Sequence, residues 1–218
     1  MRAVRLTLAL SLALVPVTTS WAAPKTAEIP AILLEIEKKY QAAATLSAEF
    51  NQINEQAALG TTKKSAGVIF IKHPDKMRWE TRTPDANTLV SNGKTVWFYT
   101  PPFDEEDRGQ VIEKSAKSIR SKLMDALLAG KFSATRGLQI REKTPQSFVL
   151  IPKKGTAGTV KRAEIEVSLE RKWIQKVIIE HRDGNRSEIA LSNIELGKPL
   201  EDSQFNFAPP PNTDRVRE

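Results

Sequence analysis

Two histidines limit the catalytic and metal-binding chemistry that this chain could perform. They are His73 and His181, and the chain contains no cysteine. A Ser-His-Asp triad or a multi-histidine metal centre therefore has few candidate members, and cysteine metal sites and disulfides are excluded. We expect no catalytic residue, no metal site and no cofactor, so the chain is not predicted to be an enzyme.

Two further segments carry groups that could bind a ligand. Residues 153–159 have the composition of a phosphate-binding loop, but they lack the Gly-x-x-x-x-Gly-Lys-Ser/Thr order and lead into a predicted strand, not a helix. We interpret them as a flexible hairpin loop. The acidic run Asp104-Glu105-Glu106-Asp107 is typical of a solvated loop, and docking of a basic partner is the alternative interpretation.

The first residues have the pattern of an export signal. Arg2 and Arg5 precede an apolar run over residues 6–15, and Ser20-Trp21-Ala22 is a small-x-small cleavage site. The apolar run is half of the roughly 20 residues that a membrane-spanning helix needs. We expect a signal peptide at 1–22, cleaved near Ala22, and one exported domain at 23–218.

The charge of the chain indicates a basic protein. The net charge is +7, and removing the two arginines of the predicted signal peptide leaves +5. A soluble basic monomer is one interpretation, and attraction to anionic lipid headgroups or an acidic partner is the other. Nucleic acid is not an expected partner, because the charges are spread along strands and no basic segment occurs.

Hydrophobic periodicity predicts two helices among many strands. The first helix runs to about Ala43 with an apolar face, and the second spans 115–129 and ends at Gly130. The predicted strands begin at Leu46 and continue as 65–72, 77–82, 88–91, 95–99, 137–143, 148–152, 162–170, 173–182, 186–196 and 205–207. Asn92-Gly93 predicts a tight hairpin, and Ser192-Asn193 predicts a bulge in the last long strand.

This pattern predicts a mainly β protein with a few α-helices. The favoured arrangement is a single strongly curved antiparallel sheet of about eleven strands, with helices against its concave side. Two packed sheets are the competing arrangement.

Large apolar side chains occupy both faces of several predicted strands. Trp97-Phe98-Tyr99 places aromatic rings on both sides of one strand, and Met77 and Trp79 share a face of another. A sheet covered on both sides by packed layers accounts for this pattern. A concave face that the helices fill only partly, leaving a cavity for acyl chains, accounts for it equally, and the sequence leaves both interpretations open.

The order of several short motifs resembles that of the periplasmic outer-membrane lipoprotein carriers, the LolA family. In chain order the motifs are Phe50-x-Gln52, the block 67–80, Asn92-Gly93-Lys94, Trp97-Phe98-Tyr99-x-Pro101, Gln110-Val111 and Phe205-x-Phe207-x-Pro209-Pro210. The resemblance implies an unclosed β-barrel under a helical lid. It also implies a periplasmic chaperone that receives acylated lipoproteins from an inner-membrane ABC transporter and delivers them to an outer-membrane receptor.

The resemblance also implies site residues. Met77 and Trp79 match cavity-lining positions, and Phe50 is assigned to the same lining. The predicted acyl-chain cavity is Phe50, Met77, Trp79, Phe98, Leu123, Met124 and Leu127, the last three from the predicted lid helix, which matches only loosely.

His73 departs from the family pattern. The family commonly has an arginine at this place, where it holds the lid closed through hydrogen bonds to lid backbone. An imidazole has at most two donors and an unperturbed pKa near ~6.5, against the permanent charge and five donors of arginine. We predict a weaker or pH-dependent lid latch at His73, and an exposed turn residue is the alternative.

Three rivals to the carrier remain at this stage. The first is a periplasmic carrier of another amphiphile, such as a glycolipid. The second is a periplasmic hydrolase, for which the sequence offers no motif. The third is a sensor domain that only binds partners, which predicts a well-filled interior.

Overall fold

The fold is seen in a computed structural model that describes residues 29–104, 106–119, 123, 126–127, 130–133, 138–153 and 156–217. The signal peptide predicted at 1–22, with its cleavage site near Ala22, lies outside these residues.

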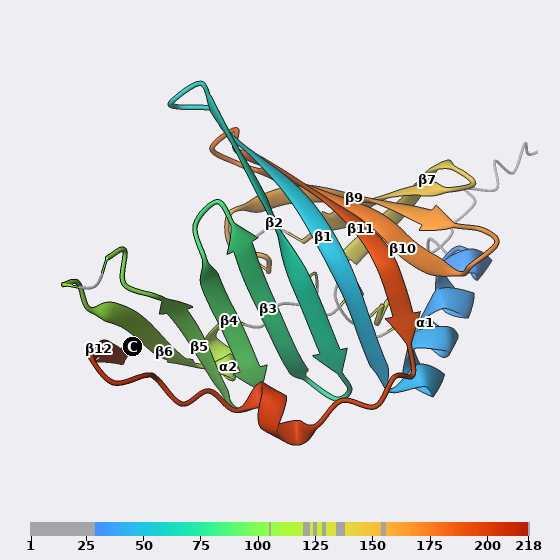
Figure 1. Ribbon diagram of the computed structural model, residues 1–218. Coiled ribbons are helices and arrows are strands. Elements are labelled where there is room, and N and C mark those ends of the chain that lie inside the picture. Colours follow the sequence, from blue (N-terminus) through green and yellow to red (C-terminus); the bar gives the residue numbers. More distant parts are fainter. Residues whose placement is uncertain are drawn as a thin grey trace, which may run out of the picture.

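One 12-stranded sheet makes up most of the described chain (Figure 1). Its strand order is β12-β6-β5-β4-β3-β2-β1-β11-β10-β9-β8-β7, and every pairing is antiparallel except that of β12 with β6. The sheet is strongly curved and its two edge strands, β7 and β12, do not pair with each other. The prediction of a single curved sheet is confirmed, and two packed sheets are ruled out. The strands are β1 Thr45–Gln56, β2 Thr61–Lys72, β3 Lys76–Thr83, β4 Asn87–Asn92, β5 Thr95–Thr100, β6 Gly109–Ser115, β7 Leu138–Thr144, β8 Ser147–Pro152, β9 Val160–Ser168, β10 Trp173–His181, β11 Arg186–Leu196 and β12 Thr213–Arg217.

Helix α1 (Ala31–Ala43) covers part of the concave face. Leu33, Ile36 and Tyr40 recur at helical spacing and are all buried, which explains why this segment packs as a helix against the sheet. Pro30 stands at its N-terminus, where a missing N–H costs nothing. The helix ends at Ala44, whose φ of 61° turns the chain into β1.

The predicted strand at 205–207 is wrong, and two strands were not predicted. Asp202–Phe205 is a 3₁₀ helix, η1, and the residues after it are not in a strand. Phe205 is fully buried where η1 contacts β3 and β4. The apolar pattern that predicted a strand therefore comes from an irregular segment that packs onto the sheet. Strands β6 and β12 pair with each other in parallel, and they raise the count from about eleven to 12.

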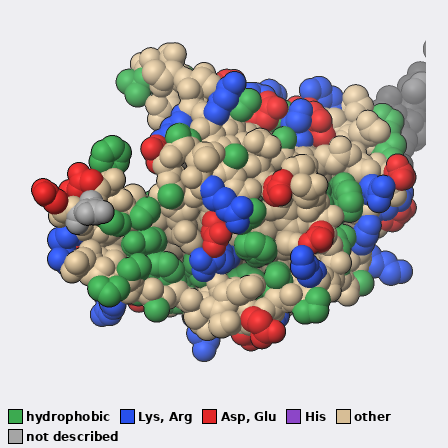
Figure 2. Space-filling view, in the orientation of Figure 1, with side chains coloured by type: hydrophobic (Ala, Val, Ile, Leu, Met, Phe, Trp, Pro, Cys, Tyr) green, Lys and Arg blue, Asp and Glu red, His purple; other side chains and the backbone are tan. Residues whose placement is uncertain are grey.

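The segment 197–212 runs across the convex side of the sheet and joins β11 to β12 (Figure 1). Lys72 and Lys76 both form ion pairs with Asp202, and hydrogen bonds from the two ammonium groups lower the pKa of that carboxyl to about 2. Further along, Phe207 packs on Tyr99 with ring centroids 5.2 Å apart. Charged side chains of both signs are interspersed over this face (Figure 2).

A bulge bends β11 where the sequence predicted one. Ser47 pairs with Glu195 and Glu49 pairs with Ser192, so one extra residue stands on β11 opposite Ala48. Asn193 adopts φ of 49° within this bulge, a conformation that asparagine tolerates better than most residues.

The predicted second helix is described only in part. Helix α2 spans Ala116–Ile119, and residues 123, 126 and 127 are also helical. Leu123 and Ala126 are buried in the core between the sheet and α1. The structure therefore supports part of a helical lid over the concave face.

Candidate binding cavity on the concave face

One half of the concave face carries most of the buried core. Side chains of strands β7 to β10 and of α1 belong to one buried core cluster there, and most of the large ones are less than 5% exposed. We call this half the filled half; its central members are Leu33, Ile36, Leu123, Phe132, Phe148, Leu150 and Ile165, each at most 2% exposed.

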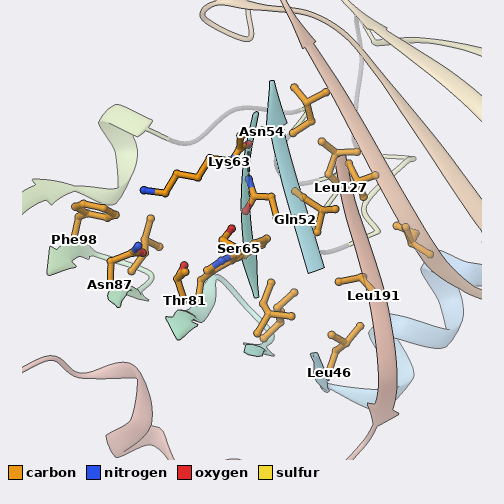
Figure 3. A pocket seen from close by; sticks show the side chains of 18 of the residues that line it. Leu46, Gln52, Asn54, Lys63, Ser65, Thr81, Asn87, Phe98, Leu127 and Leu191 are labelled. Atoms are coloured by element: carbon orange, nitrogen blue, oxygen red, sulfur yellow. Dashed lines mark hydrogen bonds between the residues drawn. The ribbon is translucent and has the colours of Figure 1, made fainter. Parts of the chain in front are cut away.

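The other half of the concave face holds a cavity of about 460 Å³ (Figure 3). Its lining comes from strands β1 to β5, from β10 and β11, from Tyr40 of α1, and from Leu127 of the predicted lid helix (115–129), which we call the lid segment. Tyr40 stands at the border of the two halves, where its hydroxyl accepts a hydrogen bond from the backbone N–H of Ile174 at 2.9 Å. Burial raises the pKa of Tyr40 to about 12.

The cavity has an apolar end and a polar end. Along β2, Ile71 and Ile69 line it nearest to α1, and Ser65 and Lys63 line it further away. Along β1, β3 and β4 the lining residues also change from apolar to polar. The reason is the strand register, which places apolar residues beside apolar ones and polar residues beside polar ones. The apolar end includes Leu46, Ile69, Ile71, Trp79, Leu89, Phe98, Leu127 and Leu191, and the polar end includes Gln52, Asn54, Lys63, Ser65, Thr81, Asp85 and Asn87.

A glycine shapes the floor of the cavity. A Cβ added to Gly67 would lie 1.8 Å from the backbone oxygen of Glu80 and 2.9 Å from Cε1 of Phe50. Only glycine allows β3 to approach this closely and the Phe50 ring to lie across β2. Phe50 then contacts Trp79, with ring centroids 4.5 Å apart, and Trp79 itself lines the cavity.

The structure brings three of the seven predicted cavity residues to the lining, namely Trp79, Phe98 and Leu127. Phe50 and Leu123 are buried below it, at 1% and 2% exposure, and Met77 is partly buried against the core beside Trp79. Met124 lies outside the described residues.

The polar end was not predicted from the sequence. Gln52, Ser65 and Thr81 belong to three different strands, and nothing in their local sequence marks them as neighbours. Phe50-x-Gln52 was the one available signal, since an i, i+2 spacing places Gln52 on the face of Phe50.

Two charged residues line the cavity within the described part of the chain, and they pair with each other. Lys63 forms an ion pair with Asp85 across the polar end, with both side chains more than half exposed. The lining therefore carries no net charge.

His73 lies in the turn between β2 and β3. Its backbone N–H donates to Ala44 O at 2.8 Å, and its side chain makes no hydrogen bond with any other described residue. Burial lowers the pKa of His73, and the ammonium group of Lys131 lowers it further, against a smaller opposing effect of Asp75. Lys131 belongs to the chain just after the predicted lid helix, so His73 stands close to the segment that a latch would hold.

The described residues offer little for other kinds of site. They contain no group of three or more His, Cys, Asp or Glu side chains that could hold a metal ion. His181 lies at the end of β10, with its Nδ1 3.0 Å from Oγ1 of Thr159. None of the helices in this part of the chain is long and apolar enough to cross a membrane.

Comparison with known proteins finds the same family over most of the chain. The sequence model of the family described as "Outer membrane lipoprotein carrier protein LolA" matches residues 41–208. An outer-membrane lipoprotein carrier protein of Sodalis glossinidius is 31% identical over 189 residues, covering 87% of this chain and 88% of its own. The carrier of Vibrio campbellii is 30% identical over 177 residues, 81% of each chain. A solved structure of an uncharacterized conserved protein from Thermus thermophilus shares the fold, with a TM-score of 0.52, 13% identity, and coverage of 86% of this chain and 97% of its own.

Proposed function

The chain belongs to the LolA family of outer membrane lipoprotein carrier proteins, and from this premise we propose that it carries acylated lipoproteins across the periplasm. It receives them from an inner-membrane ABC transporter and delivers them to an outer-membrane receptor. In this proposal residues 1–22 are a cleaved signal peptide, and residues 23–218 are the carrier domain.

The observation that carries this proposal is the contrast in packing across a single concave face. Next to a buried core, Trp79, Leu89 and Phe98 line a cavity that the protein leaves unfilled. Phe98 is 40% exposed although its strand, β5, has a hydrogen-bonded neighbour on each side. Exposed apolar surface of this kind is unfavourable in water unless an apolar ligand covers it.

The energetics suit a carrier. Burying an acyl chain is worth about 0.8 kcal/mol per CH₂, so a chain of about 15 methylenes contributes ~12 kcal/mol when it leaves water. Extraction of such a chain from a bilayer needs an external energy source, and the carrier itself needs only to cover the chain. A cavity that is loosely filled by its cargo favours onward transfer to a receptor that binds more tightly.

The roles of individual residues follow from their places. Trp79, Phe98 and Leu127 contact the acyl chains directly, whereas Phe50 and Met77 support Trp79 from the floor and the side. Leu123 anchors the lid segment in the core, and His73 is the proposed latch that holds this segment when the cavity is empty.

Release of lipoprotein from membranes tests the proposal. Inner-membrane vesicles containing a labelled lipoprotein are incubated with ATP and the protein, and the soluble label is measured after sedimentation. We expect soluble label with the wild type, little with Leu89→Asp, which places a charge in the cavity, and wild-type release with Leu59→Asp. Leu59 is 70% exposed in the β1–β2 turn and is absent from the cavity lining, which makes it the matched control. Failure of the wild type to solubilise any label would contradict the proposal.

A further inference from the structure

The polar end of the cavity has hydrogen-bonding groups that the protein itself does not satisfy. Gln52 Nε2 donates to Asn54 Oδ1 at 2.9 Å, and the hydroxyl of Ser187 donates to the same oxygen at 2.6 Å. Gln52 Oε1 and Asn54 Nδ2 make no other hydrogen bond with the described residues. The hydroxyls of Ser65 and Thr81 are likewise without a partner in this part of the chain.

These groups are arranged as one surface. Figure 3 shows Gln52, Ser65 and Thr81 in succession along one side of the pocket, with Leu127 and Leu191 on the other side. They come from β1, β2 and β3, which are neighbours in the sheet, so their spacing is fixed by backbone hydrogen bonds. A ligand whose apolar part lies against Ile69 and Ile71 at the apolar end therefore presents its other end to these amides and hydroxyls.

The charge of this end is balanced. Lys63 and Asp85 are the charged residues of the described lining, and each neutralises the other. A phosphate group in this position would need a cation to pair with. If it formed an ion pair with Lys63, Asp85 would be left unpaired beside a second anion. An uncharged polar group meets no such conflict.

We infer that the cavity selects amphiphiles whose head, next to the acyl chain, is uncharged and rich in hydrogen-bond donors and acceptors, and that it discriminates against phosphate heads. This inference rests on the proposed function, because it assigns the polar end to the part of the cargo that follows the acyl chains. The amide and ester groups of an acylated polypeptide have this chemistry, and so do the hydroxyls of a neutral glycolipid. The inference runs against the net charge of +5 that remains after removal of the proposed signal peptide, which by itself attracts anions.

Displacement of a neutral fluorescent probe tests the inference. N-phenyl-1-naphthylamine is loaded into the wild type and displaced by three ligands of equal chain length, each below its micellar concentration. The ligands are an N-dodecanoyl dipeptide amide, dodecyl glucoside and dodecyl phosphate. We expect both uncharged ligands to displace the probe at lower concentration than dodecyl phosphate, with the dipeptide amide the more effective of the two.

Two variants connect the result to the polar end. Thr81→Val keeps the side-chain shape but removes the hydroxyl, so affinity for the dipeptide amide should fall about 2- to 10-fold while affinity for the probe is unchanged. Asp85→Asn frees Lys63, so affinity for dodecyl phosphate should rise about 2- to 5-fold. Glu170→Gln, at an exposed position in the β9–β10 turn, makes the same change in net charge and should leave that affinity unchanged.

Each outcome of these measurements has a separate meaning. Equal or tighter binding of dodecyl phosphate by the wild type would overturn the inference and leave the carrier function standing. Tighter binding of dodecyl glucoside than of the dipeptide amide would support the selection of uncharged heads but contradict a polypeptide as its source. If the wild type binds neither the probe nor any of the ligands, the proposed function fails together with the inference.

Discussion

The filled half and the cavity half of the concave face are made by the same sheet, yet they differ in packing. Leu150 of β8 is fully buried in the core cluster to which α1 and Phe132 also belong. Leu89 of β4 also points into the concave side, but it faces the cavity and remains partly exposed. The difference indicates that the packing that stabilises the fold is concentrated in one half, which leaves the other half available to bind a ligand.

The sharpest test of this comparison is the same truncation made in each half. Leu150→Ala removes a fully buried side chain and should lower the free energy of unfolding by about 2–5 kcal/mol. Leu89→Ala should lower it by less than about 1 kcal/mol, because its side chain is already partly in water. Urea denaturation of both variants gives the two values. Equal losses would show that the cavity half is as important to stability as the filled half.

The floor of the cavity is expected to be the exception within its half. Gly67→Ala would force β2 and β3 apart, because the new Cβ meets the Glu80 carbonyl at 1.8 Å. We expect a loss of about 1–3 kcal/mol in the free energy of unfolding, together with weaker probe binding as the Phe50 ring is displaced from Trp79. Wild-type stability with unchanged probe affinity would contradict the role given to this close approach.

The hydroxyl of Tyr40 is expected to stabilise the border between the two halves. Tyr40→Phe leaves the ring in place but removes the acceptor for the Ile174 N–H, which stays buried without a partner. The expected loss is about 1–2 kcal/mol of unfolding free energy, measured by urea denaturation. A neutral effect would mean that this backbone group finds another acceptor.

In the cavity itself, the effect on binding should exceed the effect on stability. Phe98→Ala should change the free energy of unfolding by no more than about 0.5 kcal/mol and weaken probe binding several-fold, since the ring is 40% exposed before the ligand arrives. Leu59→Ala, outside the cavity, should alter neither quantity. The comparison would break down if Phe98→Ala destabilised the protein and left probe affinity intact.

The smallest expected effect is that of pH on the proposed latch. The pKa of His73 is lower in the folded protein than in the unfolded chain, so the unfolded state binds more protons as the pH falls below about 6.5. The stability difference between wild type and His73→Leu should therefore shift against the wild type from pH 7.5 to pH 5, and protonated His73 should repel Lys131 and loosen the lid segment. Cargo binding by the two proteins, measured at both pH values, tests the latch. Identical binding at both would dismiss it.

Much of the fold could be predicted because local chemistry determined it. Gly93 specifies its hairpin by adopting φ of 88°, and Asn193 marks the bulge by adopting φ of 49°. Strand β12 was out of reach, since it pairs in parallel with β6, about a hundred residues earlier in the chain. Phe205 gave a false strand signal because its burial comes from an irregular segment lying on the sheet.

The site could be predicted only where side-chain type was sufficient. Trp79 and Phe98 stood out as large aromatic residues on a two-sided apolar strand pattern, and both line the cavity. Thr81 and Ser65 did not stand out, because a hydroxyl residue in a strand is ordinary and its meaning depends on cross-strand register. Whether the concave face was full or hollow depended on how far α1 reaches across it, which no local pattern encodes.

The two unjoined edges of the sheet have a mechanical consequence. Because β7 and β12 share no hydrogen bonds, the distance between the margins of the sheet is set by strand twist and curvature, both of which are soft. A sealed barrel would have to rupture a row of interstrand bonds to admit a thicker guest. In the open sheet a small decrease in curvature, shared over many residues, is sufficient to widen the entrance of the cavity. The sheet regains its curvature elastically when the ligand leaves.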